Sequence, residues 1–137
     1  MRDEGLRRLT PGYLENITDT KTKVVVINGP NDTNRFTILT PTARKKLRLI
    51  RYTIWGTATA VAGVLELYFG TAADAEAATT VIDLLTTPGS AGASSATRTW
   101  ARGHGPGGVK DGVLSGRFRT APGGVNFIHV IEYTEED

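Results

Sequence analysis

Residues that could carry metal or acid–base chemistry are few in this chain. It has two histidines, His104 and His129, and no cysteine. A metal site on a β-fold would need about three histidine or carboxylate ligands, with two histidines alternating along one strand. His129 alternates instead with Phe127 and Ile131, a pattern typical of a packed or interface residue. His104 lies in a glycine-rich loop without a nearby carboxylate. We therefore predict no metal site and no cofactor.

The glycine-rich segment 103–108 (GHGPGG) is a candidate for phosphate binding. A P-loop requires Gly-Lys-Ser/Thr at the start of a helix, so that backbone amides and the lysine meet the phosphates. Here Val109-Lys110-Asp111-Gly112 follows, and a strand-like run comes next. The segment therefore predicts a hinge-like loop and no phosphate site.

Nucleophilic and paired-carboxylate chemistry have equally little support. No serine lies in a Gly-x-Ser-x-Gly turn. Glu66 and Asp83 could pair for glycoside cleavage, but both lie in ordinary strand-like runs. Glu66 alternates with Leu65 and Leu67, so it should face away from the core. We predict that the chain is not an enzyme.

Composition is that of one soluble domain. The chain has 137 residues and 39% hydrophobic residues. It has no run near the roughly 20 apolar residues that cross a bilayer, and its first residues lack the apolar region of a secretory signal. We expect a cytosol, or a particle assembled in one. The absence of cysteine and glutamine is one mark of thermostable proteins, although twenty threonines fit a β-rich protein equally well.

Eight strand-like runs separated by turn-forming residues must position these side chains. They are 23–28, 35–40, 46–55, 63–69, 79–86, 97–102, 113–119 and 125–134. This spacing predicts an all-β, single-domain, eight-stranded jelly-roll-like sandwich or barrel over residues 22–137. The loop segment 72–78 could form one helical turn.

The run 46–55 changes phase in its middle. Leu47 and Leu49 share one face, whereas Ile50, Tyr52 and Ile54 take the opposite phase. Because side chains alternate strictly along a strand, a slip of one residue predicts a β-bulge.

The last run is apolar on both faces. Phe127, His129 and Ile131 share one face, and Ile128 and Val130 share the other. Such a strand is either central in its sheet or lies at a subunit contact. We predict Phe127, His129 and Ile131 as partner-binding residues.

A basic cluster opens the third run. It has five cations in eight residues: Arg44, Lys45, Lys46, Arg48 and Arg51. They could protect an exposed strand edge from pairing, or contact an acidic protein or a phosphate backbone. Nucleic-acid binders usually add exposed aromatic side chains for stacking. Tyr52 and Trp55 are near but fall into expected core positions, so a protein partner is favoured over nucleic acid.

Charge is distributed unevenly although the net charge is only +2. The basic cluster lies far along the chain from an acidic tail that ends at Asp137. Separate positive and negative patches would suit docking on copies of the chain or on a charged platform.

Residues 1–21 are predicted to be an N-terminal arm. Apolar side chains are sparse among its charges, and Thr10-Pro11-Gly12 interrupts any helix. An arm of this composition cannot order alone. It is either a disordered tail or a segment that orders on a neighbouring subunit. The predicted contact residues are Leu6, Leu9, Tyr13 and Leu14.

The architecture resembles a known group of virion proteins. The arm, the hairpin TPTARKKLRLIRYTIWGTATAVAGVLELYFG and the closing GRFRTAPGGVNFIHVIEYTEE are similar to those of tailed-phage head decoration (cementing) proteins, including proteins from phages of thermophilic bacteria. The resemblance implies a homotrimer on the capsid exterior, assembled in the host cytoplasm. It would clamp the major capsid protein, with its arm on a neighbour.

Two alternatives remain open from the residues. One is a small enzyme, which would need a converging polar pocket that the sequence does not indicate. The other is a binding module. Jelly rolls also serve as receptor- or glycan-binding modules of phage tails and fibres. Such a module should expose an aromatic side chain on a shallow groove, and Trp100 is the candidate.

Overall fold

The computed structural model describes residues 20–28, 32–56, 63–87, 94–121 and 126–137, and these residues form eight strands and no helix. The strands are β1 (Lys21–Asn28), β2 (Phe36–Leu39), β3 (Lys46–Gly56), β4 (Gly63–Phe69), β5 (Thr80–Thr87), β6 (Ser94–Thr99), β7 (Leu114–Phe118) and β8 (Asn126–Glu136). Each of the eight predicted runs overlaps one strand, so the predicted all-β class is confirmed.

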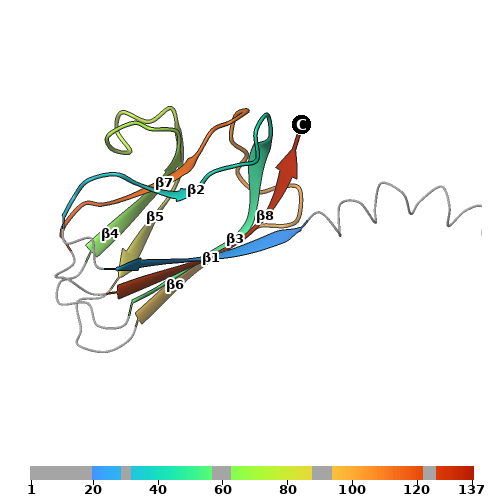
Figure 1. The fold of residues 1–137 in the computed structure, drawn as a ribbon. Helices are drawn as coiled ribbons and strands as arrows, with labels where there is room; N and C mark the ends of the chain where they lie inside the picture. The colour runs from blue at the N-terminus through green and yellow to red at the C-terminus, as the bar shows by residue number, and fades with distance from the viewer. Residues whose placement is uncertain (1–19, 29–31, 57–62, 88–93, 122–125) are drawn as a thin grey trace, which may run out of the picture.

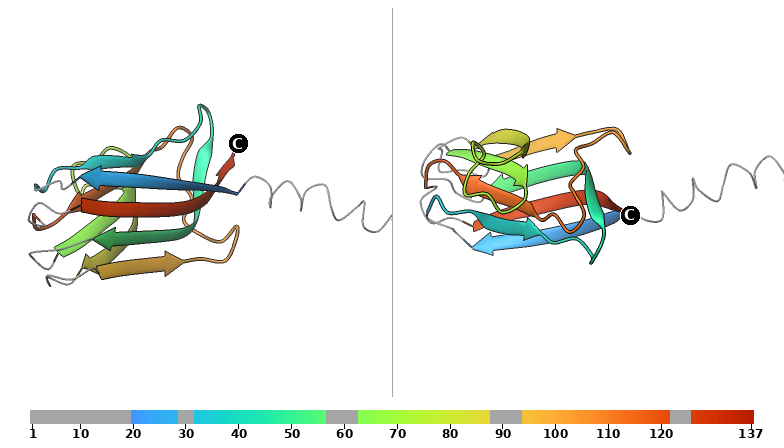
Figure 2. Two further views of the ribbon diagram at one scale, coloured as in Figure 1. Left: turned by 60° about the horizontal axis from the view of Figure 1, so that its bottom comes forward. Right: turned by 90° about the horizontal axis from the view of Figure 1, so that it is seen from above.

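The strands form two four-stranded antiparallel sheets packed face to face (Figure 1). The first sheet has the order β1-β8-β3-β6 and the second has the order β2-β7-β4-β5. Figure 2 shows the four strands of the first sheet side by side. The chain crosses between the sheets at most connections, which is the strand order of a jelly roll. The predicted eight-stranded sandwich is therefore confirmed.

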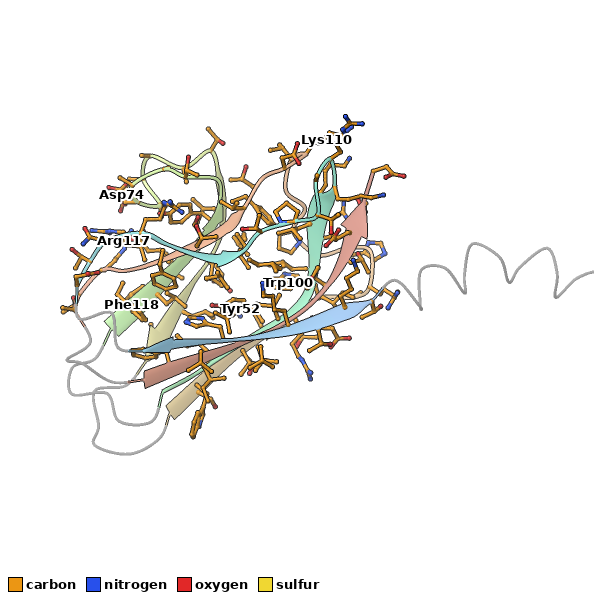
Figure 3. All side chains as sticks on the ribbon, viewed as in Figure 1. Tyr52, Asp74, Trp100, Lys110, Arg117 and Phe118 are labelled. Atoms are coloured by element: carbon orange, nitrogen blue, oxygen red, sulfur yellow. The ribbon has the colours of Figure 1, made fainter. Side chains whose placement is uncertain are left out.

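The core lies between the two sheets. Tyr52 of the first sheet and Phe118 of the second point into this space (Figure 3). The Phe118 and Phe127 rings meet across it with centroids 4.8 Å apart. Alternating apolar side chains on inward faces explain why these sequences pair as sheets that cover one another. The buried core residues also include Leu47, Leu49, Ile54, Leu65, Leu67 and Leu114.

The predicted bulge in β3 is confirmed. The register of β3 against β8 shifts between Leu49 and Arg51, so Ile50 is the extra residue. The shift lets Leu49 and Tyr52 both face the core despite their odd spacing. In Figure 1 the start of β3 and the end of β8 rise together, away from the rest of the first sheet.

Strand β8 is central in its sheet, which is one of the two positions that the sequence predicted for it. It lies between β1 and β3. Phe127, His129 and Ile131 are fully buried, facing the second sheet. This burial corrects their predicted placement: within one copy of the chain they offer no surface to a partner. The opposite face of β8, with Ile128 and Val130, is partly exposed.

The bounds of β6 differ from the prediction, whereas the turn predicted in segment 72–78 is present. Strand β6 runs over Ser94–Thr99, three residues earlier than predicted, because Ser94–Ala96 pair with the end of β3. The amide of Trp100 instead donates to the carbonyl of Ile50. The segment 72–78 does contain one helical turn, in which the Ala78 amide donates to the Asp74 carbonyl at 3.1 Å.

Most of the predicted arm lies outside the described residues. This includes its four predicted contact residues, Leu6, Leu9, Tyr13 and Leu14. Of the arm's 21 residues, Thr20 and Lys21 are described, and Lys21 opens β1.

Candidate functional site

The basic cluster and the acidic tail lie side by side. Strands β3 and β8 run antiparallel, with Lys46 opposite Glu136 and Arg51 opposite Glu132. Ion pairs join Arg51 to Glu132 at 3.5 Å, Lys45 to Asp137, and Arg48 to Glu136. The predicted separation of positive and negative patches is therefore wrong, because strand pairing brings the two charged segments together.

The remaining cations of this cluster have different surroundings. Lys46 lies at the start of β3 and is partly exposed. Arg44 is exposed, and its backbone adopts a φ of 67° in the turn before β3. The Arg44 amide donates to Asp111 at 2.6 Å. The cluster thus contributes to holding strand ends and loops together.

Arg48 joins the glycine-rich loop to the end of β8. Its guanidinium donates to Glu136 and, from Nη1, to the Gly105 carbonyl at 2.8 Å. The hydrogen bond to Glu136 raises the pKa of Arg48 above its usual value. Gly105 packs so closely that a Cβ there would lie 1.8 Å from the Leu49 carbonyl oxygen.

The same loop is bound along β3. The Leu49 amide donates to the Pro106 carbonyl at 3.0 Å, and the Gly108 amide donates to the Leu47 carbonyl at 2.8 Å. The prediction of a hinge is therefore wrong, because the loop acts as a short added strand. Its Gly108 amide already has an acceptor and does not face a phosphate cradle.

Replacing Arg48 tests whether this side chain holds the glycine-rich loop to the end of β8. Arg48→Met should lower the free energy of unfolding by about 1.5 kcal/mol, because charge-assisted hydrogen bonds to a loop and a tail are lost. Chemical denaturation at low and high salt measures the change. The exposed Arg44→Ala variant is the matched control, and it should change stability by less than about 0.5 kcal/mol. Equal effects of the two variants would contradict the assignment.

A buried ion-pair cluster lies on the second sheet. Glu66 on β4 is fully buried. One of its oxygens accepts from Arg117 Nη1 at 2.8 Å and lies 3.0 Å from Arg119 Nε. Its other oxygen accepts from the Ala75 amide at 2.7 Å. Arg117 also donates from Nε to the Thr33 carbonyl at 2.7 Å. The carboxylate therefore joins segments that are far apart in sequence.

The loop between β4 and β5 covers this cluster. It folds over the outer face of the second sheet, with Asp74 on the same side as Arg117 (Figure 3). Tyr68 donates to the Ala72 carbonyl at 2.7 Å, and Ser115 donates to the Gly70 carbonyl at 2.5 Å. Alternation correctly predicted that Glu66 faces away from the core. It could not reveal that a loop buries the carboxylate there.

His129 is a neutral histidine in the core. Its Nδ1 shares a hydrogen bond with the Tyr52 hydroxyl, and its ring meets Phe36 edge-on. Burial lowers the pKa of His129 from 6.5 to about 3 and raises that of Tyr52. Its Nε2 has no hydrogen-bond partner among the described residues. The packed alternative predicted for this histidine agrees with its surroundings.

The outer face of the first sheet carries an apolar surface. In register across β1, β8 and β3, Val26 lies beside Ile128 and then Trp55. In the next row, Val24 lies beside Val130. Val24 is 59% exposed, Val26 57% and Trp55 38%. We call these five residues the outer apolar face.

Both tryptophan side chains lie elsewhere than predicted. Trp55 was expected in the core but is exposed, because it lies on the opposite phase from Tyr52 and Ile54. Trp100 was the candidate for a glycan-binding aromatic, but it packs partly buried against the core. Among the described residues, Trp55 is therefore the aromatic side chain that is exposed on a sheet.

Metal and membrane searches give two plain results. Across the described ranges, no group of three or more histidine or acidic side chains could hold a metal ion. No helix long and apolar enough to span a membrane occurs in the same residues.

Comparisons with known proteins give only distant structural matches. No family model matches the chain, and no curated protein matches it. A protein of the disulfide-linked pili of Bacillus endospore appendages is 16% identical, with 84% of this chain and 86% of that one covered and a TM-score of 0.40. A virus-like particle protein of the extra small virus of the prawn Macrobrachium rosenbergii is 10% identical, with 86% and 80% covered and a TM-score of 0.40. Matches at this level say nothing about function.

Proposed function

We propose that the chain is a non-enzymatic structural protein of a phage virion. It forms a homo-oligomer, a trimer in the simplest case, and binds the exterior of the assembled capsid through contacts with the major capsid protein. Its role is to stabilise the lattice. Binding to the assembled lattice in preference to the loose subunits favours the assembled state by mass action.

The observation that carries this proposal is the outer apolar face. Val24, Val26 and Trp55 are large exposed apolar side chains in two neighbouring rows on the outer side of the first sheet. Adjacent exposed apolar side chains on a soluble protein mark a protein interaction surface when they form a contiguous patch. Meanwhile Lys45, Arg48 and Arg51 of the basic cluster are engaged in ion pairs with carboxylates of the acidic tail. The surface therefore suits assembly with other protein chains.

The assignment to a phage capsid is supported by a resemblance in the sequence. The arm, the hairpin and the closing strand pair resemble phage decoration proteins, and the jelly roll is a fold used in viral capsids. The arm of residues 1–21 would extend a contact to a neighbour. Trp100 gives the glycan-binding alternative little support, because its ring packs against the core.

A sedimentation experiment tests the proposal. The probe is empty particles assembled from the major capsid protein that is encoded beside this chain in its genome. We expect the chain to pellet with the particles but not with the unassembled capsid protein. The particles should also unfold at a higher temperature when the chain is bound. Mass photometry of the chain alone should give three times the 14.7 kDa chain mass.

Deletion of residues 1–19 is the informative variant, because it leaves all eight described strands complete. It should weaken pelleting about tenfold or more, which corresponds to about 1.4 kcal/mol of lost contact energy. A full-length chain that stays monomeric and never pellets with these particles would exclude the proposed function.

A further inference from the structure

The outer apolar face has no cover among the described residues. The outer face of the second sheet differs, because the loop between β4 and β5 folds over it and places Ala75 against Glu66. On the first sheet, Val26 and Trp55 are exposed in one row with Ile128. No described loop crosses the outer side of this sheet in Figure 2. Solvent exposure of Val24 and Val26 exceeds half of each side chain.

The chain itself supplies a segment suited to this face. Residues 1–19 lie outside the described structure and lead directly into β1, the edge strand of the same sheet. They carry apolar side chains that have no core of their own, interspersed with seven charged residues. These apolar residues are Leu6, Leu9, Tyr13, Leu14 and Ile17. Contact between these side chains and the outer apolar face would remove apolar surface of both from water.

The direction of β1 favours a neighbour over the same copy. The strand starts at Lys21, and the outer apolar face begins further along it, at Val24. A segment that enters at Lys21 would have to reverse direction to cover its own Val24 and Val26. The reversal would fall in Ile17–Thr20 (ITDT), which has three β-branched residues and no glycine or proline. Such residues favour extended backbone over a tight turn.

We propose that the outer apolar face binds residues 1–19 of a second copy of this chain. This inference rests on the proposed function to the extent that it names the contact between copies of the homo-oligomer. Each copy then both donates its arm and receives one. The exchange is directional, so it can close a ring of three copies as readily as a pair.

Crosslinking between copies tests this contact directly. The chain has no cysteine, so introduced thiols react alone. Copies with Leu14→Cys are mixed with size-tagged copies carrying Val24→Cys, and a short bismaleimide is added. The control acceptor is Val81→Cys, because Val81 is 48% exposed and lies on the second sheet. We expect a covalent heterodimer from Val24→Cys at about five times the control yield, since crosslinking requires close approach of the two positions.

A double variant distinguishes the same copy from a neighbour. A chain carrying both Leu14→Cys and Val24→Cys should crosslink between copies when it is alone, and excess unmodified chain should remove most of that crosslink, because its copies have no cysteine to accept it. Crosslinks confined to one chain, or a yield no higher than with Val81→Cys, would overturn the proposal. No capsid is present in this experiment. Loss of the crosslink with intact capsid pelleting would therefore reject the arm contact and leave the proposed function standing.

The surface itself can be tested in the full chain. Val24→Lys with Val26→Lys places two charges on the outer apolar face, and it should weaken self-association at least about tenfold by mass photometry. Val81→Lys with Leu84→Lys is the matched control on exposed positions of β5. If both double variants leave self-association unchanged, the outer apolar face is not the contact between copies.

Discussion

Replacing Arg117 and Arg119 together by methionine should lower the free energy of unfolding by about 3–5 kcal/mol, because a fully buried carboxylate loses both of its cations. Glu66 is fully buried, and both arginines lie within 3.0 Å of one of its oxygens. The carboxylate would keep the Ala75 amide as its hydrogen-bond donor, which cannot balance a full charge. Urea denaturation monitored by tryptophan fluorescence measures the loss.

The sign of a second substitution makes this test decisive. In the unmodified protein, Glu66→Gln should destabilise by about 2 kcal/mol, because it removes a charge that two arginines stabilise. In the Arg117→Met/Arg119→Met background the same change should stabilise, because it removes an unpaired buried charge. Destabilisation by Glu66→Gln in both backgrounds would show that the ion pairs do not hold the carboxylate.

An exposed ion pair supplies the control. Arg98 pairs with Asp83 across the β5 and β6 edges, and the Arg98 side chain is about half exposed. Arg98→Met should therefore change the free energy of unfolding far less than the loss of the buried pairs does, because solvent screens an exposed ion pair. The contrast between the two sites isolates the effect of burial from that of pairing.

The second large effect is a loss of stability in acid that depends on His129. Its pKa is about 3 in the folded protein and 6.5 when the chain is unfolded. Below pH 6.5 the unfolded chain binds a proton that the folded chain excludes. The free energy of unfolding should therefore fall by about 1.4 kcal/mol per pH unit between pH 6.5 and 3, or about 2.7 kcal/mol at pH 4.5.

Carboxylates also contribute to acid unfolding, so the measurement must be a difference. The Tyr52→Phe/His129→Leu variant replaces both hydrogen-bond partners by apolar groups, which leaves no polar group unpaired. Its stability loss between pH 7 and 4.5 should be smaller than that of the unmodified protein by about 2.7 kcal/mol. The exposed His104→Gln variant should keep the full loss. Equal pH dependence in all three proteins would contradict the role of His129.

Local patterning of the sequence was sufficient to predict the strands. Leu47 and Leu49 alternate in one phase and Tyr52 in the other, and this phase change correctly predicted a bulge in the middle of the run. The structure places it at Ile50. Side chains alternate with a strict period of two, so the face of each residue follows from its neighbours. The core position expected for Trp55 was wrong, although the same alternation places Trp55 out of phase with Tyr52 and Ile54.

Contacts between distant segments could not be predicted in this way. Arg48 and Glu136 are 88 residues apart, and they meet only because β8 inserts next to β3. The same pairing turned two apparently separate charge patches into one set of ion pairs. The burial of Glu66 likewise depends on where the loop between β4 and β5 folds, and nothing in the alternation of β4 contains that information.

The position of β8 between β1 and β3 has a consequence for how the protein is made. The first strand has β8 as its neighbour, so Lys21 finds its partner Tyr133 only after strands β2 to β7 have been synthesised. Until then the first sheet lacks its central strand, and β1 and β3 present unpaired edges on the ribosome. Long-range pairing of this kind folds slowly and exposes the chain to aggregation. The eleven residues of β8 therefore complete the first sheet, and a ribosome that stalls before β8 would release a chain that cannot form that sheet.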